Sequence, residues 1–100
     1  MKALNSSTNL PLEATAGTSE KGDVLIHIRR LNKGSGIDVA LESRVKALYQ
    51  EQILQTVHNK LEELKITDAR VEIKDEAAFD YVINARLETA IRRAFQVARK

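Results

Sequence analysis

Three short stretches of the chain alternate apolar with polar residues. They run from Val24 to Ile28, from Ile37 to Glu42 and from Thr67 to Lys74. Successive side chains of a strand point to opposite faces, so an alternating stretch can bury one face and leave the other in water. The first stretch also places Val or Ile at every second position, and β-branched residues favour strands. The pattern predicts three strands.

The connection between the first two predicted strands is rich in residues that tolerate a positive φ. It reads Asn-Lys-Gly-Ser-Gly over residues 32–36. Short connections of this composition commonly close hairpins. We therefore expect the first two strands to pair as an antiparallel hairpin with one buried face. The position of the third strand in the sheet does not follow from the pattern.

Two longer stretches repeat apolar residues every three or four positions, which is typical of amphipathic helices. The first stretch runs from Val45 to Leu64, and Ser43 before it is a plausible N-cap. The second runs from Phe79 to Ala98, and Asp75 can cap the segment that follows it. The sequence therefore predicts two helices separated by the third strand.

The element order β-β-α-β-α fits a small α+β domain of two layers. Amphipathic strands and helices with matching apolar stripes bury both when the two helices pack on one face of a short sheet. Residues 1–21 contain Ser, Thr, Asn, Gly and Ala without a regular period, which predicts a flexible N-terminal arm that ends in a loop. We place the domain itself at residues 22–100.

Composition limits the chemistry. The chain has 100 residues, 43% of them hydrophobic, and no cysteine. One small domain with a thin core does not favour a stand-alone enzyme. The lack of cysteine excludes a thiolate zinc site, an iron–sulfur cluster and a cysteine nucleophile. The apolar runs are far shorter than the roughly 20 residues of a membrane span, and the first residues are polar, so we expect a cytoplasmic protein that does not contact a membrane.

Candidate catalytic groups are few. His27 and His58 have no partner at the spacing of a metal site or a catalytic triad, so we interpret both as surface or boundary residues and expect no metal. The adjacent acidic pairs 62–63 and 75–76 could serve acid–base chemistry only in a cleft that separates their pKa values. We interpret them as solvated.

The second predicted helix is locally basic. Its five cationic side chains are opposed by Glu88 alone. Cations near a helix C-terminus interact favourably with the helix dipole, which explains part of the pattern. The other interpretation is a surface for a phosphate-bearing cofactor or an acidic subunit. Nucleic acid is a poorer partner, because the net charge is only +2 and stacking aromatics are scarce. The five cations are Arg86, Arg92, Arg93, Arg99 and Lys100.

The segment Ala16–Val24 brings small, flexible residues to the start of the first predicted strand, so it can present a side chain to a modifying enzyme. Here the sequence resembles the acyl carrier protein, or gamma subunit, of bacterial citrate lyase. The segment follows that family's AGT-x-E-S-[GS]-D-[VI] opening, and a later segment follows D-K-G-A-L-D-x-[IV]-x-A-R-x-x-A. The matching residues are Ala16, Gly17, Thr18, Glu20, Gly22, Asp23 and Val24, then Asp75, Ala78, Asp80, Ile83, Ala85, Arg86, Leu87, Glu88, Ala90, Arg93 and Ala94.

The resemblance implies a non-catalytic carrier. In the family, a serine hydroxyl is joined through a phosphodiester to 2'-(5''-phosphoribosyl)-3'-dephospho-CoA, whose thiol carries acetyl and citryl groups. The implied partners are the alpha (transferase) and beta (lyase) subunits of citrate lyase and a prosthetic-group transferase. The modified serine of the family corresponds to Lys21, which has no hydroxyl. Ser19, two residues earlier, has one, and we take it as the candidate attachment residue.

Two other functions stay open. A chain of this fold without the usual serine can be an unmodified structural or interaction module that docks through its basic helix or an open sheet edge. A small nucleic-acid-binding domain is the third candidate, and it would show affinity that falls steeply with salt.

Overall fold

The structure, a computed structural model, describes residues 13–45 and 47–95. They form a four-stranded sheet and two helices in the order β-β-β-α-β-α. The elements are β1 (Glu13–Gly17), β2 (Val24–Arg30), β3 (Ile37–Ser43), α2 (Ala47–Glu63), β4 (Ala69–Asp75) and α3 (Asp80–Phe95). The three strands and two helices predicted from periodicity are all present, and one further strand precedes them.

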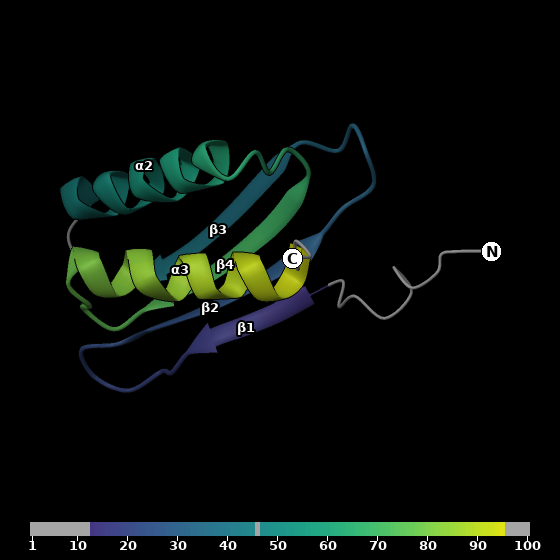
Figure 1. Cartoon of the computed structure of the whole chain (residues 1–100). Coiled ribbons are helices and arrows are strands. Elements are labelled where there is room, and N and C mark those ends of the chain that lie inside the picture. Colours follow the sequence, from purple (N-terminus) through teal and green to yellow (C-terminus); the bar gives the residue numbers. More distant parts are fainter. Residues whose placement is uncertain (1–12, 46, 96–100) are drawn as a thin grey trace.

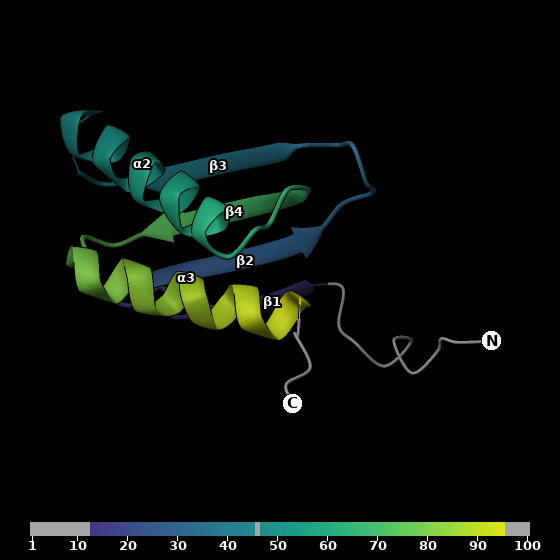
Figure 2. The same ribbon diagram turned by 45° about the horizontal axis from the view of Figure 1, so that its top comes forward.

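Both helices cover the same face of the sheet, which confirms the predicted two-layer α+β arrangement (Figures 1 and 2). The inward residues of β2, of which Ile26 is fully buried, pack against the apolar stripes of the helices. Val57 of α2 and Leu87 of α3 are likewise fully buried. The core therefore lies between the sheet and the helices. Burial of each large aliphatic side chain in it stabilises the fold by about 1.5–3 kcal/mol.

The predicted hairpin of β2 and β3 is wrong. The sheet order is β1-β2-β4-β3, so β4 lies between the two strands and is antiparallel to β2 and parallel to β3. Parallel neighbours need a long crossover, which α2 supplies. Crossing one intervening strand requires about 10 Å, a distance that the segment 31–36 spans easily. Asp68 fixes that segment by accepting the amide N–H groups of Gly34 and Gly36 at 3.0 and 2.7 Å.

Part of the predicted flexible arm is a strand. Glu13–Gly17 forms β1 and pairs antiparallel with β2, from Glu13 opposite Arg29 to Gly17 opposite Leu25. Ala16 is 5% exposed and belongs to the core. The rest of the predicted arm, residues 1–12, lies outside the described residues.

The helix ends differ slightly from the predicted ones. Ser43 is the last residue of β3; its hydroxyl accepts the amide N–H of Val45 at 3.1 Å and so shapes the bend before α2. Asp75 likewise accepts the amide N–H of Ala78 in the bend before α3, which begins at Asp80. The predicted helical stretch to Ala98 is described only as far as Phe95.

The face of the sheet away from the helices is polar. His27 lies between Glu13, at 2.5 Å, and Glu72, at 3.8 Å. Arg70 bonds to Asp38 and, at 2.9 Å, to Glu72. Arg70 and Asp38 therefore place opposite charges across neighbouring strands, which stabilises a solvated sheet surface modestly. Of the described helices, neither is long and apolar enough to span a bilayer.

Candidate functional site: the loop between β1 and β2

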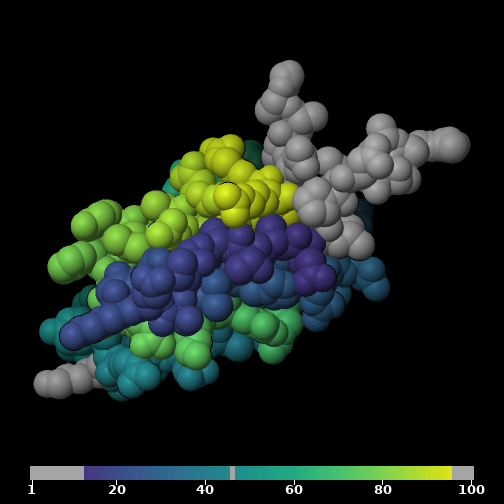
Figure 3. All heavy atoms as spheres, turned by 90° about the horizontal axis from the view of Figure 1, so that it is seen from below, coloured from purple at the N-terminus to yellow at the C-terminus, as the bar shows by residue number. Residues whose placement is uncertain are grey.

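The segment Thr18–Asp23, called here the β1–β2 loop, connects the two strands at the end of the sheet where α3 begins (Figure 1). The side chains of Ser19, Glu20 and Lys21 are exposed at its tip. Figure 3 shows the loop projecting beside the first turns of α3. Another protein can therefore approach these three residues directly.

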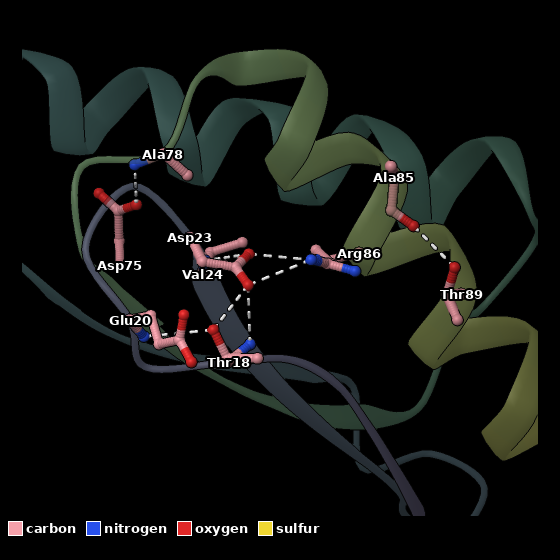
Figure 4. Close-up of polar contacts among 9 residues, drawn as sticks. All are labelled: Thr18, Glu20, Asp23, Val24, Asp75, Ala78, Ala85, Arg86 and Thr89. Carbon is pink, nitrogen blue, oxygen red and sulfur yellow. Dashed lines mark hydrogen bonds and ion pairs between the residues drawn. The ribbon is translucent and has the colours of Figure 1, made fainter.

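Asp23 holds the base of the loop together. Its Oδ2 accepts the amide N–H of Thr18 at 3.1 Å and the hydroxyl of Thr18 at 2.7 Å, and its Oδ1 accepts the amide N–H of Val24 at 2.7 Å (Figure 4). The Thr18 hydroxyl in turn accepts the amide N–H of Glu20 at 3.2 Å. One carboxylate thus ties both ends of the loop to each other.

Arg86 of α3 connects this base to the helix layer. Its Nε donates to Asp23 Oδ1 and its Nη2 to Asp23 Oδ2, each at 3.1 Å. Such paired bonds fix both the distance and the orientation of the two planar groups. The hydrogen bonds from Arg86, followed by those from the Thr18 hydroxyl and the Val24 amide, lower the pKa of Asp23 to about 2. Asp23 is therefore ionised at neutral pH.

Backbone contacts anchor the other side of the loop. The amide N–H of Gly22 donates to the carbonyl of Glu76 at 2.7 Å, and the amide N–H of Glu76 donates to the carbonyl of Asp23 at 3.0 Å. Gly17, where β1 ends, has a φ of 91°, and a Cβ atom there would lie 1.8 Å from the carbonyl oxygen of Val24. Only glycine fits this close approach. The loop is therefore fixed at its base and presented at its tip.

Ser19 and Lys21, the two residues singled out in the sequence, both lie at this tip. The Ser19 hydroxyl makes no hydrogen bond to another described residue, whereas the Thr18 hydroxyl is engaged by Asp23. Of the two hydroxyls in the loop, that of Ser19 is therefore the more accessible. Lys21 is also exposed, but its side chain ends in an amine and offers no hydroxyl for a phosphodiester bond.

The basic residues of α3 are largely engaged within the protein. Arg86 binds Asp23, Arg92 donates to Glu88 at 3.0 Å, and Arg93 donates to the carbonyl of Thr15 at 2.9 Å. The last contact covers part of the exposed edge of β1. These bonds favour the structural interpretation of the basic pattern. Arg99 and Lys100 lie outside the described residues.

The predicted solvated state of the acidic pairs is only partly right. Glu62 and Glu63 are exposed on α2, but Asp75 is 1% exposed. Its Oδ2 accepts the Ser43 hydroxyl at 2.8 Å, so it joins the end of β3 to the bend before α3. Glu76, the other member of the second pair, bonds to Arg44 at 2.6 Å. Asp75 is therefore a structural residue in the interior.

His27 and His58 are not brought together, and His58 is exposed on α2. Among residues 13–45 and 47–95, no group of three or more potential ligand side chains is arranged to hold a metal ion. The residue pair that sequence reasoning missed is Asp23 with Arg86. Each falls within one of the two matched motifs, but nothing local indicates that the two side chains meet.

The sequence of the chain also matches known proteins. Residues 12–94 match the model of an acyl carrier protein family described as malonate decarboxylase delta subunit (MdcD). The citrate lyase acyl carrier protein of Oenococcus oeni is 44% identical over 82 residues, which cover 81% of this chain and 81% of that protein. The proteins of the same name from Vibrio cholerae and Yersinia enterocolitica are 39% and 40% identical, covering 84% and 82% of this chain and 85% and 84% of their own lengths.

Acyl carrier proteins as a class hold a covalent prosthetic group and do not catalyse reactions themselves. A protruding loop on a well-packed small domain suits that role, because a carrier needs an accessible attachment point more than a cleft. The family match and the identity over most of both chains give the same assignment. The chain belongs to the acyl carrier protein family that contains the malonate decarboxylase delta subunit and the citrate lyase acyl carrier proteins, and it is a non-catalytic carrier subunit.

Proposed function

We propose that the chain is the acyl carrier subunit of a citrate lyase complex and that Ser19 carries its prosthetic group. The group would be 2'-(5''-phosphoribosyl)-3'-dephospho-CoA, joined through a phosphodiester to Ser19 Oγ. The observation that supports this choice is the exposed, unengaged hydroxyl of Ser19 at the tip of a loop whose base is fixed. The bound group supplies a thiol that holds acetyl or citryl groups as thioesters.

The residues of the chain would contribute position. Asp23 and Arg86 hold the base of the β1–β2 loop, so that Ser19 stays outside the surface of the domain. A group tethered there stays near the partner active sites at a high effective concentration instead of diffusing away.

The relatives' name indicates the partners. We propose that the chain assembles with the alpha (transferase) and beta (lyase) subunits of a citrate lyase and is modified by a prosthetic-group transferase, in the bacterial cytoplasm. The acyl group would pass from the transferase to the lyase while it remains bound to the carrier. No residue of the carrier is needed as an acid, base or nucleophile in those steps.

Intact mass tests the attachment. The full chain is co-expressed with the prosthetic-group transferase and the enzymes that make its donor, and its mass is compared with that of the bare polypeptide. We expect a gain equal to the prosthetic group, located by peptide mapping to Ser19 and abolished by Ser19→Ala. Ser35→Ala is the matched control, because Ser35 is also exposed in a glycine-flanked loop. An unchanged wild-type mass would refute the modification.

Lys21 favours one alternative, an unmodified interaction module of the same fold. That chain would co-purify with citrate lyase subunits while its mass stayed that of the bare polypeptide. Co-purification together with mass therefore separates the two functions.

A further inference from the structure

The large exposed hydrophobic side chains gather at one end of the molecule. Among the described residues there are four of them. Leu48 and Tyr49 lie in the first turn of α2, and Phe79 and Tyr81 lie at the start of α3. These four residues are called here the aromatic end. Phe79 and Tyr81 are 70% and 72% exposed, and their rings stack with centroids 5.8 Å apart and planes at 8°. Stacked rings that stay in water expose apolar area that a partner can bury.

The aromatic end is continuous with the β1–β2 loop. Glu76, three residues before Phe79, exchanges backbone hydrogen bonds with Gly22 and Asp23. A recess lined by Tyr49, Ala78 and Asp80, among others, joins the start of α2 to the start of α3. The loop and the first turns of both helices lie at the same end of the ribbon (Figure 1), and Figure 3 shows the loop beside the first turn of α3.

Polar side chains on two other surfaces of the described domain already bond to neighbours within it. The open sheet face pairs His27 and Arg70 with acidic neighbours, and the basic side chains of α3 bond to Asp23, Glu88 and the carbonyl of Thr15. Those surfaces have little to gain from a partner, because a new contact would replace bonds already made. By contrast, no part of residues 13–45 and 47–95 covers the side chains of the aromatic end, which are all more than half exposed.

We propose that the aromatic end is the surface through which the carrier docks onto the catalytic core that receives its tethered thioester, in an apolar depression beside the entrance of the active site. This inference rests on the proposed carrier function. Aromatic residues are enriched among the few side chains that carry most of the energy of an interface. A contact adjacent to the loop would orient the tether toward the active site, and its small size would let the carrier leave again.

The test measures binding of the unmodified full-length chain to the assembled alpha–beta core of the cognate citrate lyase, purified without its carrier. Binding of wild type is compared with that of the double variant Phe79→Ala/Tyr81→Ala by biolayer interferometry. We expect the double variant to bind at least 10-fold more weakly. His58→Ala is the matched control, because it removes an exposed ring from the outer surface of α2, and it should bind within 2-fold of wild type.

Folding of the variants is checked by thermal unfolding, and Tyr49→Ala provides a second substitution at the same end. Equal binding by wild type and the aromatic variants would overturn the docking surface, as would a wild type that does not bind the core. The mass measurement is independent of this result. A wild type that binds through the aromatic end but gains no mass would refute the attachment at Ser19 and leave the docking surface standing.

Discussion

Arg86 and Asp23 are 63 residues apart in the chain, yet two hydrogen bonds of 3.1 Å join their side chains. The pair connects α3 to the base of the β1–β2 loop, so the helix layer determines where the loop leaves the domain (Figure 4). The Asp23 carboxylate also accepts hydrogen bonds from the hydroxyl of Thr18 and the amide N–H of Val24, the first residue of β2. Loss of this one group should therefore affect both stability and the presentation of the loop.

Asp23→Asn should lower the free energy of unfolding by about 1–2 kcal/mol at neutral pH, since it weakens charge-assisted bonds to a partly exposed arginine. The pKa of Asp23 is about 2 in the folded protein and 3.8 ordinarily, so its stabilisation is complete above pH 3.8 and is lost as pH falls toward 2. Urea unfolding of both proteins from pH 6 to pH 2 measures the difference, which should shrink over that interval. A difference that stayed constant down to pH 2 would contradict the assignment.

Gly17→Ala should destabilise the fold severely. The added Cβ would lie 1.8 Å from a backbone carbonyl oxygen, at a φ of 91° that L-residues rarely adopt. Gly22→Ala is the matched control, because its φ is 85° but no atom lies within 4 Å of the new Cβ. We expect about 1–2 kcal/mol for the control, from backbone strain alone, and clearly more for Gly17→Ala. Chemical denaturation measures both, and equal losses would disprove the predicted clash.

Ala77→Gly should stabilise the protein by about 0.5–1 kcal/mol. Ala77 has a φ of 68°, where a Cβ is strained, and the matching position of the family motif is glycine. Lys65→Gly should act similarly, because Lys65 has a φ of 61° just beyond the end of α2. Ala85→Gly in the exposed surface of α3 is the control and should lower stability by about 1 kcal/mol. Thermal midpoints that moved the same way for all three variants would contradict this explanation.

Lys21→Ser should create a second attachment residue. The position matches the family's modified serine and is exposed at the loop tip. In a Ser19→Ala background, we expect co-expression with the prosthetic-group transferase to restore the mass gain at residue 21, whereas Lys21→Ala in the same background should not. An unmodified Ser19→Ala/Lys21→Ser chain would show that the hydroxyl at this position is insufficient for recognition.

The helices and three of the strands could be predicted because burial leaves a periodic trace in the sequence. Val57 and Leu87 fall on the predicted stripes and are fully buried. β1 left almost no trace, because its inward residues are Ala14 and Ala16, and alanine does not favour strands as β-branched and aromatic residues do. Its strand conformation depends on pairing with β2 and on cover by α3.

Strand order could not be predicted from local pattern. The glycine-containing connection after β2 suits a hairpin and equally suits a passage to the far side of β4. In the folded protein β4 pairs with β2 on one edge and with β3 on the other, while the helices cover its Ala69 and Val71. The candidate loop was located by its motif, but the Asp23–Arg86 bond that fixes it joins distant segments and has no sequence signature of its own.

The central position of β4 has a consequence for biosynthesis. A nascent chain that has left the ribosome only as far as the end of α2 holds β2 and β3 without the strand that separates them in the native sheet. The short connection allows these two strands to pair with each other, and that pairing has to open before β4 can enter. A polypeptide that ends at residue 64 should therefore be digested rapidly by protease, whereas the full chain should be protected.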